Sequence, residues 1–198
     1  MRGPTYHLCS YVIPAPKPTM TGVSFTVRDF QPDDFNTLWR IDQDCFPPGI
    51  SYSRLELKVY MRRRGSFTLV ATDGITSQKP EDTTPANNSI HQNPLGGSAS
   101  GPIAGFIVAE ASRRGVGHII TIDVVAAARR SGVGSQLLRA AEDRLRNAGC
   151  QLVELETAVD NPAALAFYKR HGYGVEKTLP RYYSNGVDAL VLAKKLPR

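Results

Sequence analysis

Apolar and polar residues alternate in short runs along most of the chain, and stretches with helical spacing interrupt these runs. The first run, at 24–30, reads Ser-Phe-Thr-Val-Arg-Asp-Phe and is rich in residues that favour strands. Further strands are predicted at 66–72, 103–110, 118–125, 151–159, 173–178 and 189–195. Strands that alternate with helices predict an α/β (α+β) fold, a single domain with one central mixed sheet flanked by helices.

Apolar spacing and capping residues predict four helices. The predicted starts are Asp33 or Asp34, a capping box of Ser53 and Glu56, Gly132, and Asn161 followed by Pro162. The second helix carries Leu55, Val59 and Tyr60 as its apolar residues. The helix at 132–148 has the clearest helical spacing, and Gly149 ends it.

Two segments depart from this pattern. Three prolines between residues 14 and 18 predict a flexible N-terminal arm at 1–22, ahead of the domain at 23–198. Residues 73–101 are rich in Pro, Ser, Thr, Asn and Gly and lack aromatic residues, which predicts a disordered insertion between two strands. The start lacks the pattern of a signal peptide, so no export is expected, and Met1 and Met20 are both possible starts.

Composition narrows the class of protein. A length of 198 residues suggests one domain, and 41% hydrophobic with 21% charged residues exclude wholesale disorder. No stretch approaches the roughly 18–20 apolar residues of a membrane-spanning helix. The net charge of +6 favours acidic partners such as phosphates, but it does not select nucleic acid. Scattered cysteines (Cys9, Cys45 and Cys150) predict a reducing cytoplasm, and the histidine spacing predicts no metal.

A glycine-rich turn joins an apolar strand to the long helix within 121–134. Backbone N–H groups at a helix start lack internal partners, and the helix dipole adds positive charge there. Gly132 and Gly134 let a phosphate approach closely, while Arg129 and Arg130 add full charges. The turn therefore predicts a diphosphate site, although glycines that only relieve backbone strain would give the same pattern.

Two other phosphate-binding patterns can be compared with this turn. A P-loop requires four residues between its glycines and a following Gly-Lys-Ser/Thr, and the turn has neither. A dinucleotide-binding fold requires a third glycine where Leu137 stands, yet Glu154 lies about twenty residues on, as a ribose-binding acid would. The dinucleotide interpretation therefore stays open at this point.

Two spaced motifs resemble the signatures of the GCN5-related N-acetyltransferases (GNAT). Arg129-x-x-Gly132-x-Gly134 is similar to their acetyl-CoA signature. The second motif runs from Leu155-Glu156 through Asp160-Asn161-Pro162 to Phe167-Tyr168 and Gly172-Tyr173. Within the superfamily, the chain most resembles the RimI-type protein N-terminal acetyltransferases. That likeness lies in Phe46-Pro47 with Tyr52, and in Arg181-Tyr182-Tyr183.

The resemblance implies a sheet splayed between its fourth and fifth strands, here 118–125 and 151–159, where the pantetheine arm of acetyl-CoA inserts. Asp123 departs from the RimI type, which usually has a small apolar residue at that place. The implied cofactor-binding residues are Ile122, Asp123, Val124, Arg129, Arg130, Ser131, Gly132, Val133, Gly134, Ser135 and Asn161.

The implied reaction moves the acetyl group of acetyl-CoA to a primary amine by direct attack in a ternary complex. The implied acceptor is the α-amine of a protein N-terminus, such as that of a ribosomal protein. Glu156 is the implied base and Tyr168 the implied acid, although Glu154 shares the strand face and could equally be the base. The implied acceptor-binding residues are Phe46, Pro47, Tyr52, Tyr182 and Tyr183.

Each of these roles has a plainer structural alternative. Glu156 could be a solvated strand residue, Tyr168 a core residue and Asn161 only a helix cap. Three competing functions also stay open: a small-molecule amine acetyltransferase, a non-catalytic basic binding module on the same fold, and a dinucleotide-dependent enzyme.

Overall fold

The computed structural model describes residues 24–74 and 101–197 of the chain. The predicted arm at 1–22 and residues 75–100 of the predicted insertion lie outside these described residues. Within the two described ranges, we find no helix with the length and apolar character to cross a membrane.

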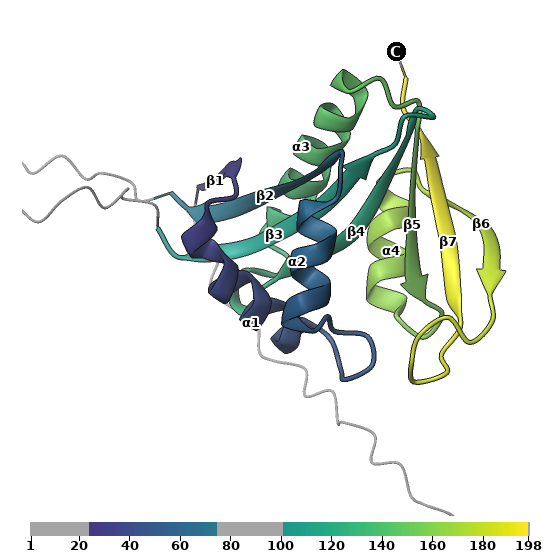
Figure 1. Ribbon diagram of the computed structural model, residues 1–198, viewed down its shortest axis with the longest axis horizontal. Helices are drawn as coiled ribbons and strands as arrows, with labels where there is room; N and C mark the ends of the chain where they lie inside the picture. Colours follow the sequence, from purple (N-terminus) through teal and green to yellow (C-terminus); the bar gives the residue numbers. More distant parts are fainter. Residues whose placement is uncertain (1–23, 75–100, 198) are drawn as a thin grey trace, which may run out of the picture.

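Seven strands form one sheet in the order β1-β2-β3-β4-β5-β7-β6 (Figure 1). β4 and β5 run parallel, and the other neighbouring strands of the described sheet are antiparallel. The bounds are β1 Phe25–Asp29, β2 Ser66–Asp73, β3 Ile103–Ala111, β4 Val116–Val124, β5 Leu152–Ala158, β6 Gly174–Leu179 and β7 Ala189–Lys195. The predicted mixed sheet is confirmed.

The ladder between β4 and β5 stops part-way along both strands. The last Cα partners of this pair are Ile119 and Leu155. Beyond them, β4 stays paired with β3 and β5 stays paired with β7. We call the stretches without β4–β5 pairing, 120–124 and 156–158, the splay, and Figure 1 shows the two strands diverging there. The predicted opening between the fourth and fifth strands is confirmed.

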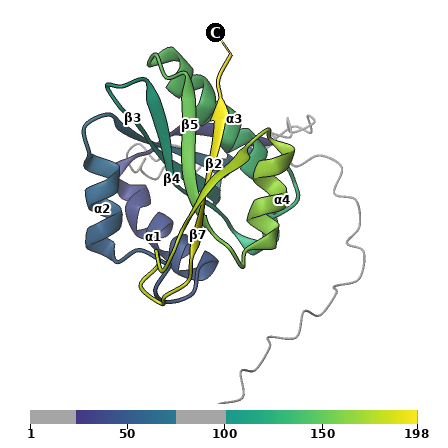
Figure 2. The same cartoon turned by 90° about the vertical axis from the view of Figure 1, so that its right-hand side faces the viewer.

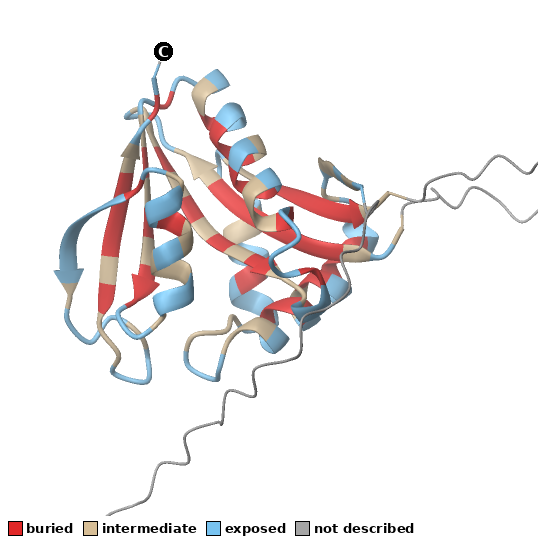
Figure 3. Ribbon diagram, turned by 180° about the vertical axis from the view of Figure 1, so that it is seen from behind, coloured by how far each residue is buried: buried red, intermediate tan, exposed pale blue. Residues whose placement is uncertain are grey.

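Two pairs of helices cover opposite faces of the sheet (Figure 2). α1 and α2 lie over a core that contains Leu38 and Phe106, whereas α3 and α4 lie over a core that contains Leu137 and Leu155. Buried residues run through the central strands, while β6 is exposed along most of its length (Figure 3). The bounds are α1 Phe35–Cys45, α2 Arg54–Arg62, α3 Val133–Asn147 and α4 Pro162–Arg170, with 3-10 turns η1 Pro32–Asp34 and η2 Ala126–Ala128.

The start of α2 agrees with the sequence, but its buried face does not. Ser53 Oγ accepts from Glu56 N–H at 3.2 Å and Glu56 Oε2 accepts from Ser53 N–H at 2.8 Å, so the capping box is confirmed. The buried residue of the helix is Leu57, while Leu55 and Val59 are exposed. Positions two residues away lie about 200° around a helix, so a helix that buries Leu57 turns both neighbours to solvent.

Asp34 occupies the N-cap position of α1, as one of the two predicted starts, but its side chain does not cap the helix. Its carboxylate accepts instead from Arg28 Nη1 at 2.7 Å and from Gln31 N–H at 2.8 Å. The predicted cap of α4 is confirmed, since Asn161 Oδ1 accepts from the backbone N–H of Ala164 at 3.0 Å.

Candidate active site

A bulge in β4 decides which side chains lie beside the splay. The β3–β4 register slips by one residue at Ile120. Before the bulge, Ile119 packs into the core under α3 and α4. After it, Asp123 stands opposite Phe106, a residue of the core under α1 and α2. Opposed residues of an antiparallel pair share a face, so Asp123 points to the α1–α2 face.

The main chain of β4 points alternately to β3 and into the splay. Val125 N–H donates to Ala104 O at 3.0 Å, so Val125 faces β3. Alternation then turns the N–H and C=O groups of Ile122 and Val124 into the splay and those of Asp123 toward β3. Ile122 and Val124 therefore have the placement expected of a backbone that holds an extended cofactor arm, and the backbone of Asp123 does not.

The turn ahead of α3 presents unpaired backbone donors. Arg130 and Gly132 adopt left-handed φ angles of 66° and 94°, which carry the chain into the helix. The N–H groups of Val133, Gly134 and Ser135 precede the first intrahelical bond, and no side chain in the described ranges caps this helix end. These donors at the positive end of a helix dipole fit the diphosphate of acetyl-CoA.

Two side chains of the same turn are engaged within the protein. Ser131 Oγ donates to Ala128 O at 2.6 Å, so its hydroxyl is engaged within the turn. Arg129 Nε donates to Val124 O at 3.0 Å, so its guanidinium reaches back to the splay. The predicted cofactor contacts of these two residues stay predictions.

Glu156 and His118 meet on the α1–α2 face. Leu155 and its β7 partner Leu192 pack in the core under α3 and α4, so the next residue, Glu156, points to the other face. Glu156 Oε2 lies 2.7 Å from His118 Nε2, and the two side chains are partly exposed. Glu154 stands opposite His118 in the parallel ladder and shares this face.

Tyr168 lies in the core, as the plainer of the two alternatives from the sequence expects. Its side chain is buried, and its ring packs edge-on against Phe167 and Tyr173, at centroid distances of 5.2 and 5.5 Å. Burial and then the nearby Asp123 carboxyl raise the pKa of the Tyr168 phenol. Its burial agrees with the plainer core interpretation, and its role as the acid stays a prediction.

Two acidic side chains lie buried where α1 crosses β4. Thr121 Oγ1 donates to the Asp123 carboxyl at 3.2 and 3.3 Å, and burial with the nearby Asp42 raises the pKa of Asp123. Asp42 accepts from Tyr52 N–H at 2.8 Å through Oδ2, while its Oδ1 has no hydrogen-bond partner in the described part of the chain. Burial raises the pKa of Asp42 to about 6. The sequence did not indicate Asp42.

The α1–α2 turn (46–53) and the β6–β7 loop (180–188) meet on the α1–α2 face. Ser184 Oγ donates to Gly49 O at 2.9 Å. Gly49 has a φ of 92°, and an added Cβ there would lie 3.1 Å from Ser184 Oγ, so only glycine suits this contact. Phe46 is half-buried and Pro47 is exposed in this turn.

Four tyrosines gather on this face: Tyr52 of the α1–α2 turn, Tyr60 of α2, and Tyr182 and Tyr183 of the β6–β7 loop. The ring centroids of Tyr52 and Tyr60 lie 5.1 Å apart, as do those of Tyr182 and Tyr183. Burial raises the pKa of Tyr182, and raises that of Tyr183 to about 12, with a further contribution from the Glu156 carboxylate to both. The carboxylate is therefore close to both phenols. The structure thus brings together the predicted base and three of the predicted acceptor residues, Tyr52, Tyr182 and Tyr183.

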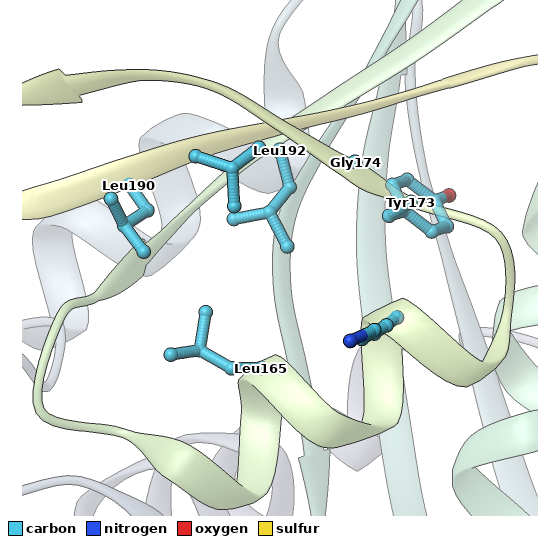
Figure 4. A pocket seen from close by; sticks show the side chains of 7 residues that line it. Leu165, Tyr173, Gly174, Leu190 and Leu192 are labelled. Carbon is cyan, nitrogen blue, oxygen red and sulfur yellow. The ribbon is translucent and has the colours of Figure 1, made fainter.

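A cavity of about 310 Å³ lies apart from this arrangement, between α4 and the strands β6 and β7 (Figure 4). Leu165, Leu190 and Leu192 surround it. Lys169 is also part of its lining. Its lining includes no residue predicted to bind the cofactor or the acceptor.

The family follows from this arrangement and from a sequence comparison. The model of the acetyltransferase (GNAT) family matches residues 36–173. The chain belongs to the GNAT family. This membership, with a mixed sheet in place of a parallel one, decides against the dinucleotide-binding interpretation.

Relatives of this GNAT chain include protein N-terminal acetyltransferases. An uncharacterized N-acetyltransferase of Methanocaldococcus jannaschii is 40% identical over 98 residues, which make up 49% of this chain and 62% of that protein. N-alpha-acetyltransferase 30 of Schizosaccharomyces pombe is 44% identical over 73 residues, or 37% of this chain and 49% of that protein. The chain therefore aligns with less than two thirds of the length of either relative.

A solved structure extends the comparison of folds. The crystal structure of the ribosomal-protein-S18-alanine N-acetyltransferase from Escherichia coli has a TM-score of 0.67 and 20% identity. The match covers 88% of this chain and 96% of that chain, and at this identity it concerns the fold. The resemblance to GNAT proteins, including N-terminal acetyltransferases, is confirmed, and the relatives support an acetyl-transferring enzyme.

Sequence reasoning missed His118, Tyr60 and Asp42. His118 showed no metal-ligand spacing, and its contact with Glu156 depends on the parallel pairing of β4 with β5. Tyr60 was assigned to an apolar helix face. The one signal in the sequence was a polar His118 at the start of a mostly apolar predicted strand.

Proposed function

We propose that this protein acetylates the α-amine of protein N-termini with acetyl-CoA, by direct attack in a ternary complex. The observation that carries the proposal is the Glu156–His118 contact of 2.7 Å, beside the splay and near the tyrosines of two acceptor-side loops. The uncapped start of α3 lies on the opposite helical layer, so the cofactor and the acceptor approach from different faces. The N-alpha-acetyltransferase relatives support this acceptor class.

Acetyl-CoA would supply an acetyl thioester whose carbonyl is open to attack by an amine. The N–H groups of Val133, Gly134 and Ser135 would hold its diphosphate, with Arg130 adding charge. The splay-facing backbone of Ile122 and Val124 would hold its arm and orient the thioester. Val124 N–H is the proposed donor to the carbonyl oxygen as negative charge develops there.

Proton movement falls to three side chains. An α-amine has an ordinary pKa near 7.7–8.0, against about 10.4 for lysine, so it needs less help to lose its proton. Glu156 accepts this proton, directly or through a water, and His118 shares it through the hydrogen bond between them. Tyr168 is the proposed donor of a proton to the departing sulfur.

The acceptor side favours an extended peptide end. Gly49 and Ser184 join the two loops, and Tyr52 is fixed by its N–H bond to Asp42 and by its O–H bond to Ile120 O at 3.3 Å. Tyrosine rings give apolar area with a polar tip, which suits a peptide backbone. Ribosomal proteins, whose synthesis in the cytoplasm matches the expected compartment, are the proposed acceptors.

The test uses the purified chain with acetyl-CoA and a panel of acceptors. The panel contains peptides with free α-amines, the same peptides blocked at the N-terminus but carrying an internal lysine, polyamines and aminoglycosides. CoA release and mass spectrometry should show acetylation of the free α-amine, and no turnover with the blocked peptides. Turnover confined to polyamines or aminoglycosides would replace the proposal with the small-molecule alternative. Salt-sensitive RNA binding without turnover would favour the non-catalytic module.

A further inference from the structure

Arg129 takes part in a three-residue contact at the end of β4. Its Nε donates to Val124 O at 3.0 Å, and its Nη2 lies 3.5 Å from Cys45 Sγ. Cys45 Sγ in turn donates to the same Val124 carbonyl at 3.5 Å. We call Cys45, Val124 and Arg129 the junction.

The junction joins the segments that take the two substrates. Val124 is the last residue of β4 and faces the splay, and Arg129 lies between η2 and the start of α3. Cys45 ends α1 and directly precedes Phe46, the first residue of the acceptor turn. The far end of that turn also rests on β4, through the bond from Tyr52 to the main chain. The cofactor-binding turn and the acceptor turn are therefore linked to each other through side-chain contacts.

The chemistry of the junction suits this role. Burial raises the pKa of the Cys45 thiol, so the thiol keeps its proton and can donate to Val124 O. The guanidinium stays charged at every physiological pH and has donors in a planar fork that can serve two acceptors. Arg129 is exposed, so its removal leaves no cavity in either core.

We propose that Arg129 is a positioning residue which couples occupation of the cofactor turn to the order of the acceptor turn. This inference rests on the proposed function, because it needs an acceptor at the 46–53 turn. It differs from the role implied by the family signature, in which Arg129 belongs to the cofactor site itself. A phosphate ligand would change CoA affinity, whereas a positioning residue changes the link between the two sites.

The experiment compares Arg129→Ala with Arg130→Ala, its neighbour of the same charge in the same turn. Calorimetry measures CoA affinity, and the affinity of the best acceptor peptide is measured with and without CoA. In the wild type, CoA is expected to strengthen peptide binding about tenfold, a common size for coupling between sites. In Arg129→Ala, the ratio of peptide affinity with CoA to peptide affinity without CoA should fall close to one, while the affinity for CoA itself stays within about threefold of the wild type. Arg130→Ala should weaken CoA about tenfold and keep the ratio.

Two further measurements keep the inference testable. Hydrogen exchange of the 42–52 segment should slow on addition of CoA in the wild type and in Arg130→Ala, but not in Arg129→Ala. Cys45→Ala should also lose this protection, and Cys45→Ser, which keeps a donor for Val124 O, should restore it.

The outcomes separate the inference from the proposed function. If no acceptor peptide is acetylated, the proposed function fails, and the exchange measurement still decides whether the junction couples the two segments. Arg129→Ala could instead weaken CoA binding tenfold, while the effect of CoA on peptide affinity and on hydrogen exchange of the 42–52 segment stays as in the wild type. Arg129 would then be a cofactor ligand, and the inference would be overturned. Absence of CoA-induced protection in the wild type would overturn it as well.

Discussion

Replacing Asp42 with asparagine should make this protein more stable near neutral pH and leave its stability almost unchanged near pH 4. The side chain is fully buried, and Oδ1 has no partner among the described residues. Its pKa is raised from 3.8 to about 6, mainly by burial. The charged form is therefore the unfavourable one in the folded protein.

The sign and the size follow from that shift. A carboxyl whose folded-state pKa is raised favours folding while it is protonated. Its contribution is complete below pH 3.8 and is lost as the pH rises through about 6. One pKa unit corresponds to about 1.4 kcal/mol, so the loss amounts to about 3 kcal/mol of unfolding free energy. Asparagine keeps an oxygen that can accept from Tyr52 N–H, and it carries no charge.

The assay is urea unfolding of the wild type, Asp42→Asn and Asp44→Asn at several pH values between about 4 and 7.5. Asp44 lies on the same helix and is exposed, so its variant controls for a change of net charge. The Asp42→Asn variant should gain stability over the wild type as the pH rises, and Asp44→Asn should not. An equal difference between Asp42→Asn and the wild type at both ends of the range would refute the reasoning.

Three more changes test the site and the packing. Glu156→Gln should lower kcat by at least about hundredfold and leave CoA affinity unchanged, because a general base contributes about 10²–10⁴-fold to the rate. The control is Glu176→Gln, at an exposed position on β6. Full activity of Glu156→Gln would show that Glu156 takes no part in the reaction. Tyr168→Phe should lower kcat about tenfold in stopped-flow turnover with an unchanged melting temperature, and wild-type turnover would leave it only a core role. In urea titrations, Leu57→Ala should lower the free energy of unfolding by about 2–5 kcal/mol, because Leu57 is buried. Leu55→Ala should lower it by less than about 0.5 kcal/mol, because Leu55 is exposed. Equal losses would contradict the burial of Leu57 and the exposure of Leu55.

Local signals in the sequence predicted the elements and part of the site. The capping box of α2 and the Asn161 cap depend on residues three apart, which are neighbours in any helix. The glycine turn before α3 was recognised because its chemistry lies within a few consecutive residues. Asp34 shows the limit of such signals, since its carboxylate bonded to Arg28 of β1 and left the helix start uncapped.

The sequence around α2 did not determine which face of this helix is buried. Leu55, Leu57 and Val59 are all apolar, and the pattern alone does not say which of them meets the sheet. Packing against the α1–α2 core selected Leu57 and exposed the other two. Likewise, His118 became a partner of Glu156 only because parallel pairing set β4 beside β5.

By itself, the sequence determined the mixed α/β fold, the anion-binding turn and the family, because each depends on periodicity or on motifs of closely spaced residues. The tertiary structure decided where the pairing of β4 with β5 stops and which face of the sheet Asp123 takes after the bulge in β4. It also decided which groups the guanidinium of Arg129 contacts. These three features depend on contacts between segments far apart in the chain. Such contacts are set by how the helices and strands pack, and no local spacing of residues encodes them.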